Sequence, residues 1–77
     1  MRLTNLEIIA LIRELCKVLE EENVNAMLAL KCYLVTEDPT YLFVNNGKNT
    51  KVKLEIVKLD RYDILDAILE AALFEKL

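Results

Sequence analysis

The sequence predicts a mainly α-helical protein in which residues 1–77 form a single helical domain with three main helices. Apolar residues recur at intervals of three and four along most of the chain, which is the period of one face of a helix. Each periodic stretch begins beside a residue that favours the start of a helix, namely Thr4, Asn25 or Asp60. The composition, 55% hydrophobic and 30% charged in 77 residues, is that of one folded domain and excludes a disordered chain.

The first predicted helix spans residues 5–22 and begins at a capping box. In the pattern Thr4-x-x-Glu7, the threonine hydroxyl accepts a hydrogen bond from the Glu7 amide, and the Glu7 carboxylate accepts one from the Thr4 amide. Leu3 and Ile8 flank this cap at the spacing of a hydrophobic staple. The apolar face is expected to comprise Ile8, Leu11, Ile12, Leu15, Val18 and Leu19.

The second predicted helix spans residues 26–36, begins after Asn25 and carries one charged residue, Lys31. A helix that is apolar on nearly all sides either lies at the centre of a core or forms part of an interface. It is expected to end before Pro39, because the residue that precedes a proline is biased away from helical geometry.

The last predicted helix spans residues 60–75. Asp60 is a suitable N-cap, and Asp63 adds negative charge to the first turn, where the helix dipole favours it. The apolar face is expected to comprise Ile64, Leu65, Ile68, Leu69, Ala72 and Leu73.

Residues 41–57 fit two different structures. The Asn46-Gly47 pair predicts a tight turn, and Val52, Leu54 and Ile56 alternate with charged residues, so the segment is typical of a short β-hairpin. Val52 and Ile56 also lie at helical spacing, which predicts an all-α fold instead. We expect the hairpin and keep the all-α fold as the alternative.

The residue inventory argues against an enzyme and against a metal or cofactor site. The chain contains no histidine, so it lacks the commonest general base and the usual cysteine–histidine zinc ligands. Cys16 and Cys32 are far apart in sequence and lie on or beside apolar stripes, which predicts buried structural thiols in a reducing compartment. No apolar run approaches the roughly 20 residues that span a bilayer, and no signal-peptide core is recognisable. We therefore expect a cytoplasmic, non-enzymatic protein without catalytic residues, cofactors, metals or a membrane segment.

The net charge of −3 argues against nucleic acid as the partner, because a nucleic-acid-binding domain of this size is normally basic. One alternative function depends on the predicted hairpin. Three helices and a hairpin that carries Lys48, Lys51 and Lys53 would form a nucleic-acid-associated module similar to a small winged helix.

A homodimer is predicted because the chain has more apolar helix surface than a domain of its size can bury. A domain of 77 residues has little interior, and the helix over 26–36 has more apolar sides than the other two helices can cover. We expect a second copy to cover the remainder through a two-fold interface. The residues expected in this interface are Leu30, Leu34, Leu69 and Leu73.

Residues 33–42, Tyr-Leu-Val-Thr-Glu-Asp-Pro-Thr-Tyr-Leu, form the most informative pattern in the chain. They resemble the block Tyr-Leu-x-(Ser/Thr)-Gly-Asp-Pro-x-Tyr-Ile of IreB, a family of small Firmicute regulatory phosphoproteins. Residues 60–66, Asp-Arg-Tyr-Asp-Ile-Leu-Asp, are similar to the Arg-Asp-Glu-Ile-Leu-Glu segment of that family's closing helix. The resemblance covers about residues 7–73.

The resemblance implies a helical, homodimeric regulatory or adaptor protein that acts through protein–protein interaction, with a regulatory kinase or an enzyme as its partner. It implies Asp38, Pro39, Tyr41 and Arg61 as the partner-binding residues. The turn itself is expected to be rigid, because Pro39 fixes φ and Asp38 can cap a turn. The alternative is that this block is only a tight link between two elements.

Two departures from the family pattern bear on function. Glu37 stands where the family has glycine. The family is phosphorylated on threonines in a tail before its first helix, whereas here the first helix is expected to begin at about residue 5. Thr4 does not match the phosphorylated motif and is expected to be a helix cap. The fold and self-association are therefore expected to carry over more safely than the phosphorylation switch.

Overall fold

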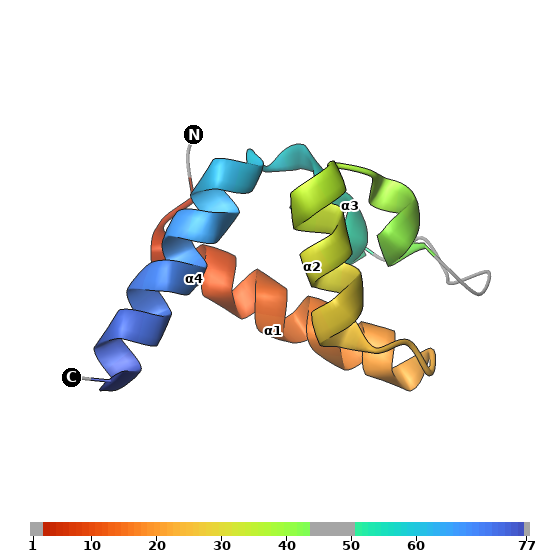
Figure 1. Cartoon of the computed structure of the whole chain (residues 1–77), viewed down its shortest axis with the longest axis horizontal. Helices are drawn as coiled ribbons and strands as arrows, with labels where there is room; N and C mark the ends of the chain where they lie inside the picture. Colours follow the sequence, from red (N-terminus) through yellow and green to blue (C-terminus); the bar gives the residue numbers. More distant parts are fainter. Residues whose placement is uncertain (1–2, 44–50, 77) are drawn as a thin grey trace.

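The computed structural model describes residues 3–43 and 51–76, and there it contains four α-helices and one short 3₁₀ helix, without a β-strand. In chain order the elements are α1 (Asn5–Glu21), α2 (Ala26–Thr36), the 3₁₀ helix η1 (Pro39–Leu42), α3 (Lys51–Lys58) and α4 (Arg61–Lys76). α1 is the central helix, since α2, α3 and α4 all pack against it (Figure 1). The short helix η1 packs against α2. The three main helices predicted from the sequence are confirmed, with ends that differ by no more than one residue.

The ends of α1 are fixed by local hydrogen bonds. The Thr4 hydroxyl accepts from the Glu7 amide at 3.2 Å, and Glu7 Oε1 accepts from the Thr4 amide at 2.9 Å, so the predicted capping box is confirmed. At the other end Asn23 adopts a left-handed conformation with φ 61°, and the Val24 amide donates to the Leu19 carbonyl at 2.9 Å. This Schellman-type turn ends the helix and leads directly to Asn25, which caps α2.

The core lies along one face of α1. Ile8, Ile12, Leu15 and Leu19 recur at intervals of four and three residues and are all buried. The buried residues that join them from the other elements are Ala26, Ala29, Leu30, Tyr33, Leu34, Leu42, Val52, Ile56, Ile64 and Ala67. No helix in the described part of the chain combines the length and the hydropathy needed to cross a bilayer.

The predicted β-hairpin at 41–57 is wrong, and the all-α alternative is confirmed. Tyr41 and Leu42 belong to η1, and residues 51–58 form α3, whereas the Asn46-Gly47 pair lies outside the described residues. In a strand Val52, Leu54 and Ile56 would share one face, but the structure buries Val52 and Ile56 and leaves Leu54 exposed. α1 offers an apolar surface on which residues one helical turn apart can both be buried, so the helical period prevails over the alternation.

Candidate functional site

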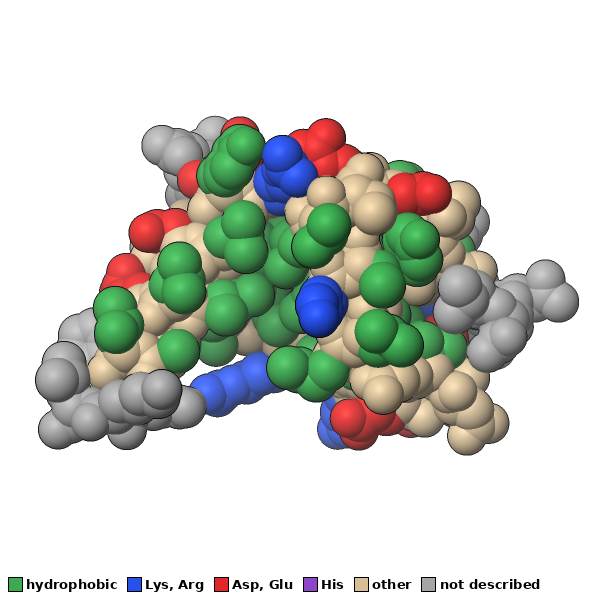
Figure 2. All heavy atoms as spheres, viewed as in Figure 1, with side chains coloured by type: hydrophobic (Ala, Val, Ile, Leu, Met, Phe, Trp, Pro, Cys, Tyr) green, Lys and Arg blue, Asp and Glu red, His purple; other side chains and the backbone are tan. Residues whose placement is uncertain are grey.

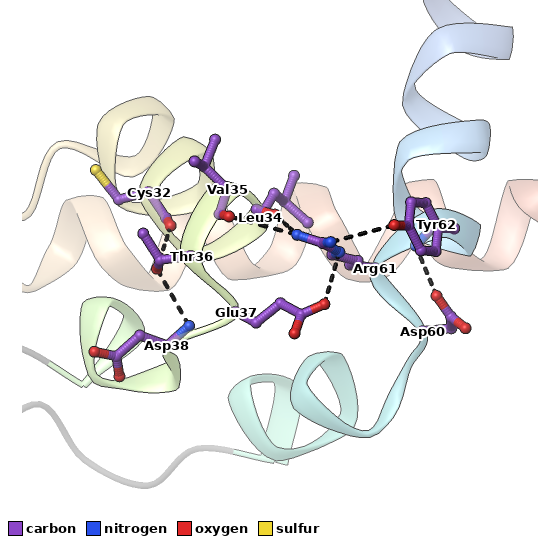
Figure 3. Close-up of polar contacts among 9 residues, drawn as sticks. All are labelled: Cys32, Leu34, Val35, Thr36, Glu37, Asp38, Asp60, Arg61 and Tyr62. Carbon is purple, nitrogen blue, oxygen red and sulfur yellow. Dashed lines mark hydrogen bonds and ion pairs between the residues drawn. The ribbon is translucent and has the colours of Figure 1, made fainter.

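The segment between α2 and η1 is a rigid, exposed turn. Asp38 Oδ1 accepts hydrogen bonds from the Thr40 hydroxyl at 2.7 Å and from the Thr40 amide at 3.0 Å. These bonds, the hydroxyl first, hold the pKa of Asp38 below its ordinary value. Thr36 Oγ1 donates to the Cys32 carbonyl at 2.7 Å and accepts from the Asp38 amide at 3.2 Å, as Figure 3 shows. Pro39 in the first turn of η1 fixes one backbone φ angle, and the hydrogen bonds of Thr36 and Asp38 hold the backbone on either side of it.

Tyr41 and Leu42, neighbours in η1, have opposite environments. The Leu42 side chain is 0% exposed and belongs to the core, whereas Tyr41 is 38% exposed. Asp38 and Pro39 are exposed as well. The structure therefore brings three of the four predicted partner-binding residues together on one surface turn, and Leu42 anchors that turn to the core.

Arg61, the fourth predicted partner-binding residue, joins the beginning of α4 to the end of α2. Its Nη1 donates to the Leu34 carbonyl at 3.2 Å and to the Val35 carbonyl at 3.4 Å (Figure 3). Its Nη2 donates to the Tyr62 hydroxyl at 3.2 Å, and the guanidinium lies 5.0 Å from the centre of the Tyr62 ring. The main hydrogen-bond donors of Arg61 are thus used within the chain, where they satisfy carbonyl groups that the end of α2 leaves open.

Glu37 completes this contact between α2 and α4. Its Oε1 lies 2.7 Å from Arg61 Nε, and the two groups form an ion pair. The N–H bond of Nε does not point at this oxygen, so the buried Nε has no hydrogen-bond partner. Glu37 ends α2 in a left-handed conformation with φ 61° and ψ 18°. This conformation favours glycine, which explains the glycine of the IreB pattern at this position. In this chain the backbone strain remains, and the side chain forms an ion pair that glycine cannot form.

Glycine and alanine at position 37 separate these two effects. Glu37→Gly removes the ion pair and the strain, whereas Glu37→Ala removes only the ion pair. Because a left-handed L-residue costs about 1 kcal/mol more than glycine, we expect Glu37→Gly to be about 1 kcal/mol more stable than Glu37→Ala. Urea denaturation of both variants at one protein concentration measures the difference. Equal stabilities would show that residue 37 carries no backbone strain.

A partly buried ion pair between Glu22, the C-cap of α1, and Lys53 of α3 was not predicted from the sequence. Lys53 is 0% exposed, and its Nζ donates to Glu22 Oε1 at 2.6 Å. The same ammonium group lies 5.4 Å from the centre of the Phe43 ring, within the range of a cation–π contact. Lys53 therefore holds together the end of α1, the residue after η1 and α3.

These observations argue against the alternative function, a nucleic-acid-associated module similar to a winged helix. It required Lys48, Lys51 and Lys53 on an exposed hairpin. Lys53 is buried and bonded to Glu22, Lys51 begins a helix, and Lys48 lies outside the described residues. A phosphate group cannot reach an ammonium group that the fold has enclosed.

Large apolar side chains remain exposed on α2 and α4. Those on α2, here called the α2 ridge, are Met27, Leu28 and Val35; those on α4, the α4 ridge, are Tyr62, Leu65, Leu69 and Leu73. Figure 2 shows hydrophobic side chains over both helices and across the surface between them. Although both helices pack against α1, they are not a closely packed pair.

The predicted dimer-interface residues divide between the core and this surface. Leu30 and Leu34 are buried within the chain and offer little surface to a second copy. Leu69 and Leu73 are 61% and 64% exposed and belong to the α4 ridge. The neighbours of Leu30 and Leu34 on the outer side of α2 are the residues that a second copy could reach.

Both cysteines are unpaired, and both are half-buried, whereas the sequence predicted buried thiols. Burial, and secondarily the nearby Glu20 carboxylate, raise the pKa of the Cys16 thiol above its ordinary value. A raised pKa disfavours the reactive thiolate, as expected for a structural thiol.

Comparison with models of known protein families gives a match. A family model described as IreB regulatory phosphoprotein matches residues 2–73, which is nearly the whole chain. Searches of curated proteins and of solved structures find no match.

Proposed function

The chain belongs to the IreB family of regulatory phosphoproteins, and we propose that it regulates a partner protein through direct contact, as a homodimer and without enzymatic activity. The observation that carries this proposal is the pair of apolar ridges on α2 and α4. Exposed apolar residues that are scattered singly need no explanation, but a contiguous set on one face is typical of a protein interface.

The spacing of the α4 ridge supports association with another helix. Tyr62, Leu65, Leu69 and Leu73 follow one another at intervals of three, four and four residues, so they form a continuous stripe along the helix. The opposite side of α4, with Ile64 and Ala67, is already buried against the chain's own core. A helix that is apolar on two sides needs a second packing surface, and a further copy of the chain supplies one.

The turn at Asp38, Pro39 and Tyr41 is the proposed contact for a regulatory kinase or an enzyme. The turn is already rigid in the free chain, so binding costs little additional conformational entropy. A half-exposed tyrosine on a rigid support is the type of residue that contributes most to binding at protein interfaces. In this proposal Arg61 acts indirectly, since it orients α4 relative to the end of α2 and does not contact the partner.

We propose in addition that the protein is cytoplasmic, and this part and the non-enzymatic part of the proposal rest on the sequence. A chain without histidine has no imidazole to activate its hydroxyl and thiol groups. Two unpaired cysteines are typical of a reducing compartment.

Sedimentation equilibrium tests the homodimer. We expect the mass of two chains at tens of micromolar and a melting temperature that rises with protein concentration, because association stabilises the folded state. Leu69→Asp places a charge in the α4 ridge and is expected to give the mass of one chain. Leu54→Asp, on the exposed side of α3, is the matched control and should leave the dimer intact. A wild-type protein of single-chain mass with a concentration-independent melting temperature would contradict the homodimer.

A further inference from the structure

We infer that the two ridges are complementary: in the homodimer proposed above, on which this inference rests, the α2 ridge of one copy packs against the α4 ridge of the other. A two-fold axis repeats this contact, so that each copy contributes both ridges to one self-complementary interface. The reason lies in the charges of opposite sign beside the two sets of apolar residues: Lys31 on α2, and Asp66 with its neighbour Glu70 on α4.

The α2 ridge carries a positive charge. Lys31 lies three residues after Leu28 and four before Val35, so it shares their face of the helix. It is exposed and is the only charged residue of α2. It makes no ion pair within the described part of the chain.

The α4 ridge carries a negative charge. Asp66 lies four residues after Tyr62, three before Leu69 and seven before Leu73, so it shares the face of the ridge. Its side chain is exposed, and Asn5 Nδ2 donates hydrogen bonds to its Oδ2 at 3.2 Å and to Glu70 Oε2 at 2.5 Å, so that Glu70 adds a second negative charge beside it. Asn5 therefore holds the carboxylate in place without neutralising its charge.

The signs of these charges distinguish between the three ways in which the ridges can pair. If α2 met α2 about a two-fold axis through the middle of the ridge, the two Lys31 side chains would approach each other. If α4 met α4 in the same way, the two Asp66 side chains would do so, and like charges at an interface are costly. Only the contact of α2 with α4 brings opposite charges together, and the two-fold axis gives that pair twice.

The arrangement of the helices allows both contacts to form at once. α2 and α4 approach each other where Arg61 binds the Leu34 and Val35 carbonyls, and from there they diverge along the molecule (Figure 1). Hydrophobic side chains of both helices appear on the same face (Figure 2). A second copy that approaches this face can therefore reach both ridges.

Charge reversal tests this pairing in the full chain. Lys31→Glu and Asp66→Lys are each expected to raise the dimer dissociation constant at least about tenfold, because each places like charges in contact. The double variant Lys31→Glu/Asp66→Lys restores opposite charges and is expected to lie within about threefold of wild type. Sedimentation equilibrium at low salt measures the dissociation constants of all three variants.

Two control variants should not weaken the dimer. Lys17→Glu makes an equal charge change on the exposed side of α1, and Asn5→Ala removes the hydrogen bond to Asp66.

A second measurement uses the unmodified protein. A zero-length carbodiimide reagent joins a lysine to a carboxylate that it touches, and in a mixture of isotope-labelled and unlabelled chains it should link Lys31 of one copy to Asp66 of the other. The pairing would be overturned, and the homodimer would remain supported, if Leu69→Asp disrupted the dimer while neither single charge reversal weakened it. Links between copies that join Lys31 only to carboxylates outside α4 would have the same consequence. A wild-type monomer would overturn the homodimer and this inference together, and the ridges would then be a surface for a different protein.

Discussion

Lys53→Met is expected to lower the free energy of unfolding by about 3 kcal/mol, because it leaves the Glu22 carboxylate without its partner. Methionine preserves most of the volume and the aliphatic character of lysine, so the substitution removes the charge and little else. The carboxylate is 19% exposed, which places the expected loss at the lower end of the range for a broken buried pair. A domain of this size has a total stability of roughly 4–11 kcal/mol, so the loss is a large part of it.

A second substitution separates the unpaired charge from other causes. In Lys53→Met/Glu22→Leu both partners are apolar, and most of the lost stability is expected to return, since replacing a whole buried ion pair by apolar residues is often neutral or favourable. Urea denaturation of the wild type, both single variants and the double variant, at one protein concentration, gives the coupling between the residues. A Lys53→Met protein as stable as wild type would show that the ion pair contributes nothing to stability.

The helix boundaries could be predicted because their signals are local. Thr4 and Glu7 are three residues apart, Asn25 bonds to the amide of Leu28, and Asp60 accepts from the amide of Tyr62 at 2.8 Å. Such contacts depend on the neighbouring sequence and hardly at all on the rest of the fold. This is why the three main helices were predicted to within one residue.

The structure of residues 51–58 could not be predicted by the same reasoning. Their apolar residues fit a strand and a helix, and the choice depends on the surface that α1 presents. The sequence pattern also assigned Lys53 to solvent, since a lysine is rarely buried without a partner. Its partner, Glu22, lies 31 residues earlier, and only the fold brings the two together.

In the candidate site, too, the local features could be predicted from the sequence and the long-range contacts could not. Asp38, Pro39 and Tyr41 are adjacent in sequence, so a rigid turn could be predicted from their types alone. The role of Arg61 depends on carbonyl groups 26 and 27 residues away, and no local pattern reveals it. The conformation of Glu37 had a usable signal, because a family glycine at the end of a helix indicates a positive φ.

Leu42→Ala is expected to lower the free energy of unfolding by about 3 kcal/mol. Leu42 is 0% exposed, and truncating a fully buried leucine removes apolar contacts and leaves a cavity, at a cost of about 2–5 kcal/mol. It is the only residue of η1 whose side chain is buried, so its truncation also weakens the attachment of the turn to the core. Thermal and urea denaturation at fixed protein concentration measure the effect.

Tyr41→Ala is the matched comparison, because it changes the adjacent residue of the same 3₁₀ helix. Tyr41 is partly exposed, so its removal is expected to cost about 1 kcal/mol or less. The difference between the two variants decides what the Asp-Pro-x-Tyr block does. If Tyr41→Ala destabilises the protein as much as Leu42→Ala, the tyrosine is a packing residue, and the block is only a tight link between α2 and the rest of the chain. If Tyr41→Ala keeps the fold and the oligomeric state of the wild type, a partner that co-purifies with the tagged wild type and not with this variant must contact the turn itself.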